Sequence, residues 1–507
     1  MKTKICSFVV VLLLFAFAGA SFGVEVGLLT SEHPLAPIRL DAPYWKLLEK
    51  HTGVTLKVET VPGSDYGSKL NVLLATGQIP DIVSGKKDLF DQYTDSGVLE
   101  PLNDLIDQYA PNVKAFIESD PDSKKVMTDG QFYHIPKFAV HKRQVARSPI
   151  WRQDIADELG LEEPETWEDL LDAFRAVKKA YPDMIPWTNR QKTEGLLVEV
   201  MYSLGAGYSI FRNQTQMYYE RDVDGGKWLY APMQPEFKEG LRVLQTAYKE
   251  GLLDPDYATN ETPQLQENIN SGKAFFYYDN NTFPASFNTN LPNVKEGARM
   301  MPINVPKGVT GKEARQYWFA TNWLTEGYVI SAKSKYKKEI MEMFNWLASE
   351  EGLLVSNWGE EGVHWDMKDG MPTLKPEIIE EARKASDPYR GVGSSLGIGG
   401  LNFTFAQDDR RMIPFDPPGY DEYLAKLFDT YKTAYHESVM YPPFSAEEGE
   451  QIKKLRAKLQ TFSLPAIDQF IIGEKSLDEF DEWAAKLKEM GGAEMEDIYN
   501  AAEARIQ

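Results

Sequence analysis

The chain has 507 residues, 76 Asp and Glu against 55 Lys and Arg, one cysteine and a formal charge of −21. Its length predicts two or more lobes rather than one compact core, and its 42% hydrophobic residues exclude a disordered chain. The acidic balance argues against a nucleic-acid binder, and the single cysteine excludes a disulfide framework and a cysteine-based zinc site.

Residues 1–23 predict a cleaved signal peptide. Two lysines precede an apolar run, residues 8–18, that is too short to span a bilayer as a helix. Small residues offer cleavage after Ala20 or Gly23. Cys6 precedes the apolar run, whereas the cysteine of a lipobox would follow it, so we expect no lipid anchor. The sequence therefore predicts an exported, soluble protein of the bacterial periplasm.

Strands and helices alternate in the first part of the mature chain. Residues 24–29, 54–58 and 81–83 predict strands, with helical patterns between them. This alternation predicts βαβ units and a mostly parallel sheet, hence an α/β fold. Ligands of such sheets collect beyond the carboxyl ends of strands. Residues 30–33 and 84–86 are therefore candidates for a ligand-binding cleft.

Local signals define further elements along the chain. Two capping boxes, Thr166 with Asp169 and Ser476 with Glu479, predict helix starts. Residues 217–230 predict a hairpin around an Asp-Gly turn. Because no fixed-period repeat or low-complexity linker interrupts the chain, we expect two interwoven lobes.

Three motifs that resemble chemical sites have simpler explanations. Residues 393–397 match the G-x-S-x-G elbow of hydrolases, but their flanks show neither a strand nor a helix, which favours a glycine-rich surface loop. Glu360 and Glu361 are adjacent, whereas the carboxyls of a glycosidase face each other across a sugar. Residues 222–225 lack the spacing of a calcium loop, and the six histidines show no zinc spacing. We therefore expect no catalytic residue, no metal site and no cofactor.

Aromatic residues in polar and glycine-rich segments predict a sugar-binding cleft. Aromatic rings stack on the apolar faces of sugar rings, while planar polar groups bind the hydroxyls. For any single tryptophan, packing in a core is the favoured alternative. The candidates are Trp187, Tyr278, Asp279, Trp318, Trp323, Trp358, Glu361, His364 and Trp365.

Residues 137–153 contain no acidic side chain, which is unusual in this acidic sequence. Their basic residues are Lys137, His141, Lys142, Arg143, Arg147 and Arg152. One explanation is a solvated positive surface, or ion pairs with the other lobe. The other is recognition of an acidic sugar, because arginine binds carboxylates in a bidentate manner. If the second explanation holds, Lys137 and Arg152 are also candidate ligand contacts.

Seven phrases, in this order, resemble the bacterial extracellular solute-binding proteins of family 1, the maltose-binding-protein-like receptors of ABC importers. They are ATGQIPDIV (75–83), GVLEPLNDLIDQYAP (97–111), DGQFYHIP (129–136), PETWEDLLDAFRAVKKAYPD (164–183), SGKAFF (271–276), WGEEGVHW (358–365) and FIIGEKSLDEFDEWAAKLKEMG (470–491). The length and the W-G-x-E-G-x-H-W segment are most similar to the long branch of receptors for oligosaccharides, including aldouronates and alginate.

The resemblance implies a two-lobed periplasmic-binding-protein fold (type II) whose discontinuous lobes are joined by hinge crossovers. Lobe one would hold residues 24–147 and about 325–375, and lobe two about 148–324 and about 376–507. The receptor would bind an oligosaccharide, neutral or uronate-bearing, between the lobes without chemistry and deliver it to permease subunits as a monomer. A secreted polysaccharide-active enzyme, and a receptor for a peptide or other non-sugar solute, are the alternatives.

Two departures from the family pattern concern a metal and an anchor. Long-branch members often carry a calcium loop after the helix that ends in Y-P-D, whereas here Pro182-Asp183 continues directly into Met184. That calcium site is therefore expected to be deleted. Many relatives also carry a lipid anchor, for which this chain has no lipobox.

Overall fold

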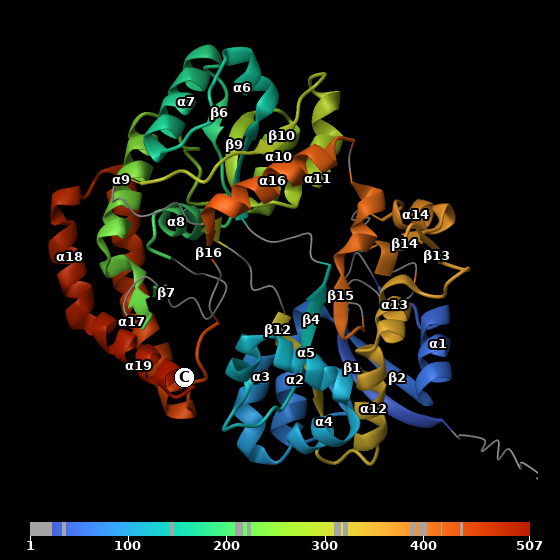
Figure 1. Ribbon diagram of the computed structural model, residues 1–507. Helices are drawn as coiled ribbons and strands as arrows, with labels where there is room; N and C mark the ends of the chain where they lie inside the picture. The colour runs from blue at the N-terminus through green and yellow to red at the C-terminus, as the bar shows by residue number, and fades with distance from the viewer. Residues whose placement is uncertain are drawn as a thin grey trace, which may run out of the picture.

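The computed structural model is organised around two β-sheets (Figure 1). It describes residues 23–32, 37–141, 147–207, 216–220, 225–308, 316–317, 323–385, 391–393, 396, 403–416, 418–436 and 440–506. The candidate signal peptide, apart from residue 23, and the basic residues 142 and 143 lie outside this part of the chain. Helices cover both sheets, so the α/β class expected from the sequence is confirmed.

The first sheet has six strands in the order β15-β4-β12-β3-β1-β2. Its strands are β1 (Val24–Glu32), β2 (Val54–Pro62), β3 (Ile82–Lys86), β4 (Ile135–Val140), β12 (Trp323–Ile330) and β15 (Ala406–Asp408). The α-helices of this half are α1 (Pro43–Thr52), α2 (Gly63–Thr76), α3 (Lys87–Phe90), α4 (Asn103–Tyr109), α5 (Pro111–Ser119), α12 (Lys337–Leu347), α13 (Glu350–Trp358) and α14 (Pro376–Ala382). A hairpin of β13 (Trp365–Lys368) and β14 (Met371–Leu374) and the short helices η2 (Pro121–Val126) and η5 (Asp409–Phe415) belong to the same half.

The second sheet has four strands in the order β10-β5-β9-β6. These are β5 (Arg147–Arg152), β6 (Ile185–Trp187), β9 (Ala274–Asn280) and β10 (Met300–Pro302). The helices of this half are α6 (Gln153–Leu159), α7 (Trp167–Ala180), α8 (Lys192–Ser203), α9 (Pro235–Lys249), α10 (Thr262–Asn270), α11 (Phe283–Asn290), α16 (Tyr420–Ala434), α17 (Ala446–Ile472), α18 (Phe480–Leu487) and α19 (Ala493–Ala504). Two small sheets complete it, β7 (Met217–Glu220) with β8 (Lys227–Tyr230) and β11 (Gln316–Tyr317) with β16 (Tyr435–His436).

Strand directions follow from how the chain passes between the sheets. β1, β2 and β3 are parallel, and β4 is parallel to β15, whereas β12 runs antiparallel between β3 and β4. In the second sheet, β5 is antiparallel to both β9 and β10. The parallel strands expected for residues 24–83 are therefore confirmed, whereas in the second sheet β5 runs against both of its neighbours. The reason is that β5 follows β4 of the other sheet, so it enters at the edge facing that sheet and runs away from it.

Local sequence signals are borne out in several elements. Thr166 and Asp169 form the reciprocal capping box of α7, and Ser476 and Glu479 form another before α18. β7 and β8 pair antiparallel as expected, while Asp224 of the expected turn lies outside the described residues. Only residues 181–184 separate α7 from β6, which is too short for a calcium loop of about twelve residues.

The C-terminal helices of the second half also contact the first half. The Lys125 ammonium in η2 lies 3.4 Å from a carboxylate oxygen of Glu503 in α19 and donates to the backbone oxygen of Met440 at 3.3 Å. The Met440 side chain is buried in the apolar core of the first half. In Figure 1 the C-terminus accordingly lies beside the lower half of the molecule. The two halves are thus linked by this contact as well as by the chain crossovers.

Candidate functional site

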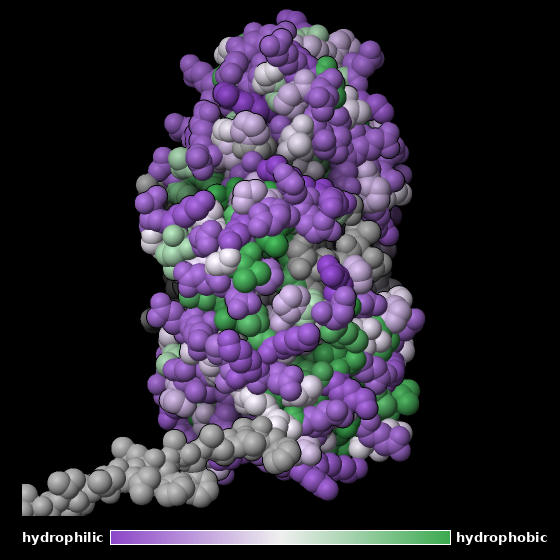
Figure 2. Space-filling view, turned by 90° about the vertical axis from the view of Figure 1, so that its right-hand side faces the viewer, coloured by the Kyte–Doolittle hydropathy of each residue, from purple (hydrophilic) through white to green (hydrophobic). Residues whose placement is uncertain are grey.

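The facing edges of the two sheets bring together chain segments that are far apart in the sequence. β1, β3, β4 and β15 end at the edge of the first sheet where the antiparallel strand β12 begins. β6 and β9 end at the edge of the second sheet where β5 begins. Figure 2 shows that hydrophobic atoms on one face of the molecule extend from its middle down into its lower half, below a mainly hydrophilic upper end. We describe this junction as the candidate site.

On the first sheet, the junction carries a small hydroxyl network. Thr30 at the end of β1 and Ser84 in β3 lie 2.8 Å apart through their hydroxyl oxygens. Tyr66 of α2 donates its hydroxyl to the Ser84 backbone oxygen at 2.5 Å. Burial raises the pKa of Tyr66 to about 12, so its hydroxyl stays protonated at neutral pH. The expected cleft residues 30–33 and 84–86 therefore do end their strands at this edge, although residues 33–36 lie outside the described chain.

On the second sheet, the junction contains a buried ion cluster. Arg147, the first residue of β5, is fully buried and forms ion pairs with Glu199 of α8 and, at 2.9 Å, with Asp279 of β9. Arg190 binds the same Asp279 carboxylate with two hydrogen bonds of 2.8 Å. Two guanidinium groups and two carboxylates thus balance one another in charge. Because buried charges are costly without partners, the cluster holds β5, β9 and α8 in a defined arrangement.

The electrostatics of this cluster centre on Glu199. Burial raises the pKa of its carboxyl above the ordinary value, against the lowering effect of Arg147, while the nearby Asp279 carboxylate raises it further. The Glu199 side chain is about 2% exposed. The ion pair with Arg147 favours the charged form of Glu199 against this burial, so Glu199 serves as a counter-ion of the cluster.

Three predicted ligand contacts on the second sheet occupy enclosed positions. Trp187 is 1% exposed, and its ring stacks on Trp167 with ring centroids 5.5 Å apart. Tyr278 is also buried in the apolar core of this half. Asp279 lies in the ion cluster and accepts from both arginines. Each of these side chains has a packing or ion-pairing role, and ligand contact by any of them stays a prediction.

The basic residues from the acid-free run are partly neutralised by acidic residues from elsewhere. Arg152 is 2% exposed and holds the Asp154 carboxylate with two hydrogen bonds of 2.7 and 2.8 Å. Arg147 belongs to the ion cluster. The Lys137 ammonium lies 4.9 Å from the ring centroid of Tyr328, a cation–π contact. Arg147 and Arg152 thus form ion pairs within the second half rather than with the other lobe.

The W-G-x-E-G-x-H-W segment folds upon itself in the first half. Trp358 donates its indole N–H to Asp408 at 3.1 Å, and Trp365 donates to the Gly359 backbone oxygen at 3.0 Å. His364 accepts the Glu360 backbone N–H at 2.9 Å through Nδ1, and burial lowers its pKa. All three rings are buried, and Trp358 and Trp365 pack in the apolar core of the first half.

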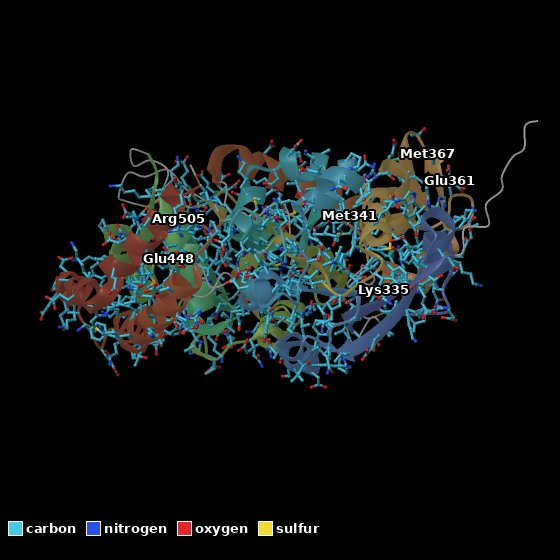
Figure 3. The ribbon with its side chains drawn as sticks, turned by 90° about the horizontal axis from the view of Figure 1, so that it is seen from below. Lys335, Met341, Glu361, Met367, Glu448 and Arg505 are labelled. Carbon is cyan, nitrogen blue, oxygen red and sulfur yellow. The ribbon has the colours of Figure 1, made fainter. Side chains whose placement is uncertain are left out.

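Glu361 from the same segment is exposed and lies beside Met367 at an outer end of the molecule, opposite the end that carries Glu448 and Arg505 (Figure 3). Two further candidates lie partly or wholly outside the described residues. Trp323 begins β12, where its backbone pairs with Lys137, but its side chain is outside the described part, and so is all of Trp318. Trp323 is therefore placed at the junction by its backbone alone.

The G-x-S-x-G run differs from the surface loop expected from the sequence. Val392 directly precedes the motif and Leu396 lies within it. The two side chains are 0% and 1% exposed and pack in the core of the first half. The expectation of a surface loop is wrong for these two residues, because both apolar side chains insert into that core. Ser394 and Ser395 lie outside the described residues. Within the described chain, no cluster of three or more His, Cys, Asp or Glu is placed to hold a metal ion.

Two residues of the junction were not singled out from the sequence, namely Gln191 and Glu199. Gln191 accepts a hydrogen bond from Arg147 at 3.3 Å through Oε1. The buried Glu199 lies mid-helix, and only its inclusion in the otherwise apolar run 196–201 could have suggested a buried partner. No composition or spacing signal points to Gln191.

Comparisons with known proteins agree with this architecture. The family model described as bacterial extracellular solute-binding protein matches residues 37–353. Two proteins of Bacillus subtilis (strain 168), lipoprotein LipO and the polygalacturonan/rhamnogalacturonan-binding protein YtcQ, are each 24% identical to the chain. In each case the match covers 90% of this chain and 87% of the relative. The crystal structure of the alginate-binding protein AlgQ2 without calcium ion superposes with a TM-score of 0.72 at 23% identity, covering 96% of this chain and 99% of that one.

Proposed function

The chain belongs to the bacterial extracellular solute-binding proteins, and on that premise we propose that it captures an oligosaccharide between its two lobes and delivers it to the permease of an ABC transporter. The observation that carries the proposal is the pair of facing sheet edges. β5 and β12 begin at these edges, directly after the chain crosses from one half to the other. The polygalacturonan/rhamnogalacturonan-binding relative supports a carbohydrate ligand.

The lobes are proposed from the packing of the two sheets. Lobe one contains the first sheet, and lobe two contains the second sheet with the C-terminal helices. Ala382, Phe403 and Phe405 pack in the core of the first half. Their packing supports placing the last lobe boundary after η5, near residue 415, rather than near the expected residue 375.

The family is extracellular, so the protein functions outside the cytoplasm. We further propose the periplasm as its compartment, with residues 1–23 as a cleaved signal peptide and a monomer as the working form. No described helix is long and apolar enough to cross a membrane. N-terminal sequencing of the exported protein tests the cleavage, and a first residue other than one following Ala20 or Gly23 would contradict it.

The charge of the sugar is the second question. An acidic ligand fits the binding partner named for the polygalacturonan/rhamnogalacturonan-binding relative. A neutral ligand fits the structure better, because Arg147 and Arg152 already bind carboxylates of this chain. We therefore propose that neutral oligosaccharides bind at least as tightly as their uronate-bearing counterparts. Calorimetric titration with matched xylo-oligosaccharides and aldouronates tests this order of affinity.

A thermal-shift screen with neutral glycans, acidic glycans and peptides tests the function itself. A ligand present at 100 times its dissociation constant stabilises the folded state by about 2.7 kcal/mol. We expect glycans to raise the melting temperature and peptides to leave it unchanged. Melting shifts with peptides alone would refute the sugar assignment, and release of shorter glycans by the purified protein would favour the enzyme alternative.

A further inference from the structure

Two successive residues at the start of α8 adopt a backbone conformation that residues other than glycine and asparagine rarely take. Gln191 and Lys192 have φ angles of 61° and 57°, in the left-handed region. This conformation costs free energy for residues with a Cβ. Such strain persists only where the surroundings enforce it, and it is concentrated at functional sites. The strained pair lies just beyond β6, at the edge of the second sheet that faces the other half.

The surroundings of the turn enforce this conformation. The Lys192 backbone N–H donates to the Asn260 backbone oxygen at 3.0 Å. Asn189 is buried and donates to the Lys192 and Tyr257 backbone oxygens at 3.0 and 3.1 Å. A Cβ on Gly195 would lie 2.0 Å from the Arg190 backbone oxygen, so this glycine permits the tight approach of the turn to α8. The loop and the helix together make a rigid support.

This support holds the Gln191 side chain in a defined direction. Its Oε1 accepts from Nη1 of Arg147, and Arg147 is itself fixed by Glu199 and Asp279. Because the oxygen of a planar amide points away from its nitrogen, the two N–H groups of Gln191 face away from Arg147. The side chain is half-buried. Arg147 follows directly on the connection between the two sheets, so the Gln191 amide lies at the junction.

We propose that Gln191 is a specificity-determining residue of the oligosaccharide site, whose amide N–H groups donate to hydroxyl oxygens of the sugar. The inference rests on the proposed function. A donor whose direction is already fixed loses little conformational entropy on binding. The guanidinium behind Gln191 is neutralised by two carboxylates, so this part of the site selects hydroxyl groups rather than ligand carboxylates.

The adjacent strained residue supplies a matched control. Lys192 shares the left-handed conformation, but its exposed side chain points to the equally exposed Glu261, with an ammonium-to-carboxylate distance of 3.3 Å. Gln191→Gly and Lys192→Gly both relieve backbone strain, and only the first removes the amide. Gln191→Met keeps the side-chain volume without the amide and serves as the second test variant. All are made in the full mature chain and compared by melting temperature and by calorimetric titration.

The titrant is the oligosaccharide that binds wild type most tightly among manno-, xylo- and galacturono-oligosaccharides. We expect Gln191→Gly and Gln191→Met to weaken binding about tenfold, and Lys192→Gly to bind like wild type. If both Gln191 variants bind within threefold of wild type, this inference is overturned and the proposed function is unaffected. An equal loss in Lys192→Gly would assign the effect to the backbone and also overturn it. If wild type binds no oligosaccharide, the proposed function fails, and this inference fails with it.

Discussion

Replacing Asp279 by asparagine separates two roles for a residue that the sequence suggested as a ligand contact. In the structure its carboxylate accepts two hydrogen bonds of 2.8 Å from Arg190 and lies 2.9 Å from Arg147. Asparagine keeps the size of the side chain but removes the charge. The substitution therefore tests whether Asp279 serves mainly as the counter-ion of the cluster.

The expected loss of stability follows from the burial of the partners. Arg147 is 0% exposed and would keep only Glu199 as a counter-ion, and the Arg190 side chain is 14% exposed. Breaking a buried ion pair by removing one partner costs about 3–5 kcal/mol, because the remaining charge is left uncompensated. We expect Asp279→Asn to lower the free energy of unfolding by about 3 kcal/mol, at the lower end of this range, because Glu199 still balances Arg147.

Urea unfolding of wild type and variant at pH 7 measures this difference. Asp481→Asn is the matched control, because Asp481 forms an exposed ion pair with Lys238 at 3.2 Å. We expect the control to change the free energy of unfolding by less than about 1 kcal/mol. An Asp279→Asn variant as stable as the control, but with lost oligosaccharide binding, would refute the counter-ion role.

Three further predictions concern positions outside the cluster. Lys125→Met and Glu503→Gln should each lower the free energy of unfolding by about 2 kcal/mol, because both side chains are only about a tenth exposed. The double variant should lose less than the sum of the two, because the two side chains contact each other. Strict additivity in urea unfolding would contradict a direct link between the halves. Burial lowers the pKa of His134 to about 4, so the stability that its neutral form confers is complete above about pH 6.5 and falls by about 3 kcal/mol as the pH drops through 4. His134→Gln should therefore reduce the pH dependence of the urea midpoint between pH 7 and pH 4. A pH dependence equal to that of wild type would contradict this. Gly195→Ala should lower the free energy of unfolding by about 2 kcal/mol or more, because its Cβ would meet a backbone oxygen at 2.0 Å. Gly449 lies in a helix with open space around it, so Gly449→Ala should raise the free energy of unfolding by about 0.5–1 kcal/mol in the same assay.

Much of the local structure could be predicted because its signals are local. The capping box of Thr166 and Asp169 uses groups three residues apart, and both bonds form in the structure. Gly77 ends α2 with a φ of 61°, which glycine adopts without strain. The hairpin of β7 and β8 follows likewise from its own sequence. These signals need no knowledge of the rest of the chain.

The candidate site was less predictable because its contacts join distant segments. Pairing of Arg147 with Asp279 depends on β5 lying beside β9, and sequence spacing does not reveal that neighbour. The indole of Trp358 is enclosed through its bond to Asp408, which the glycine-rich sequence around it does not indicate. Gln191 shows a third limit, because glutamine carries no preference for the left-handed conformation that the surroundings impose on it.

The place of β12 in the first sheet has a consequence for the order of folding. β12 lies between β3 and β4, although it begins at Trp323, long after both have been synthesised. A growing chain that ends before β12 therefore leaves two strand edges of this sheet without their partner. The second sheet, from Arg147 to Pro302, is a continuous stretch of chain and can assemble first. We expect the first sheet to close late, because its central pairings wait for the most distant contacts.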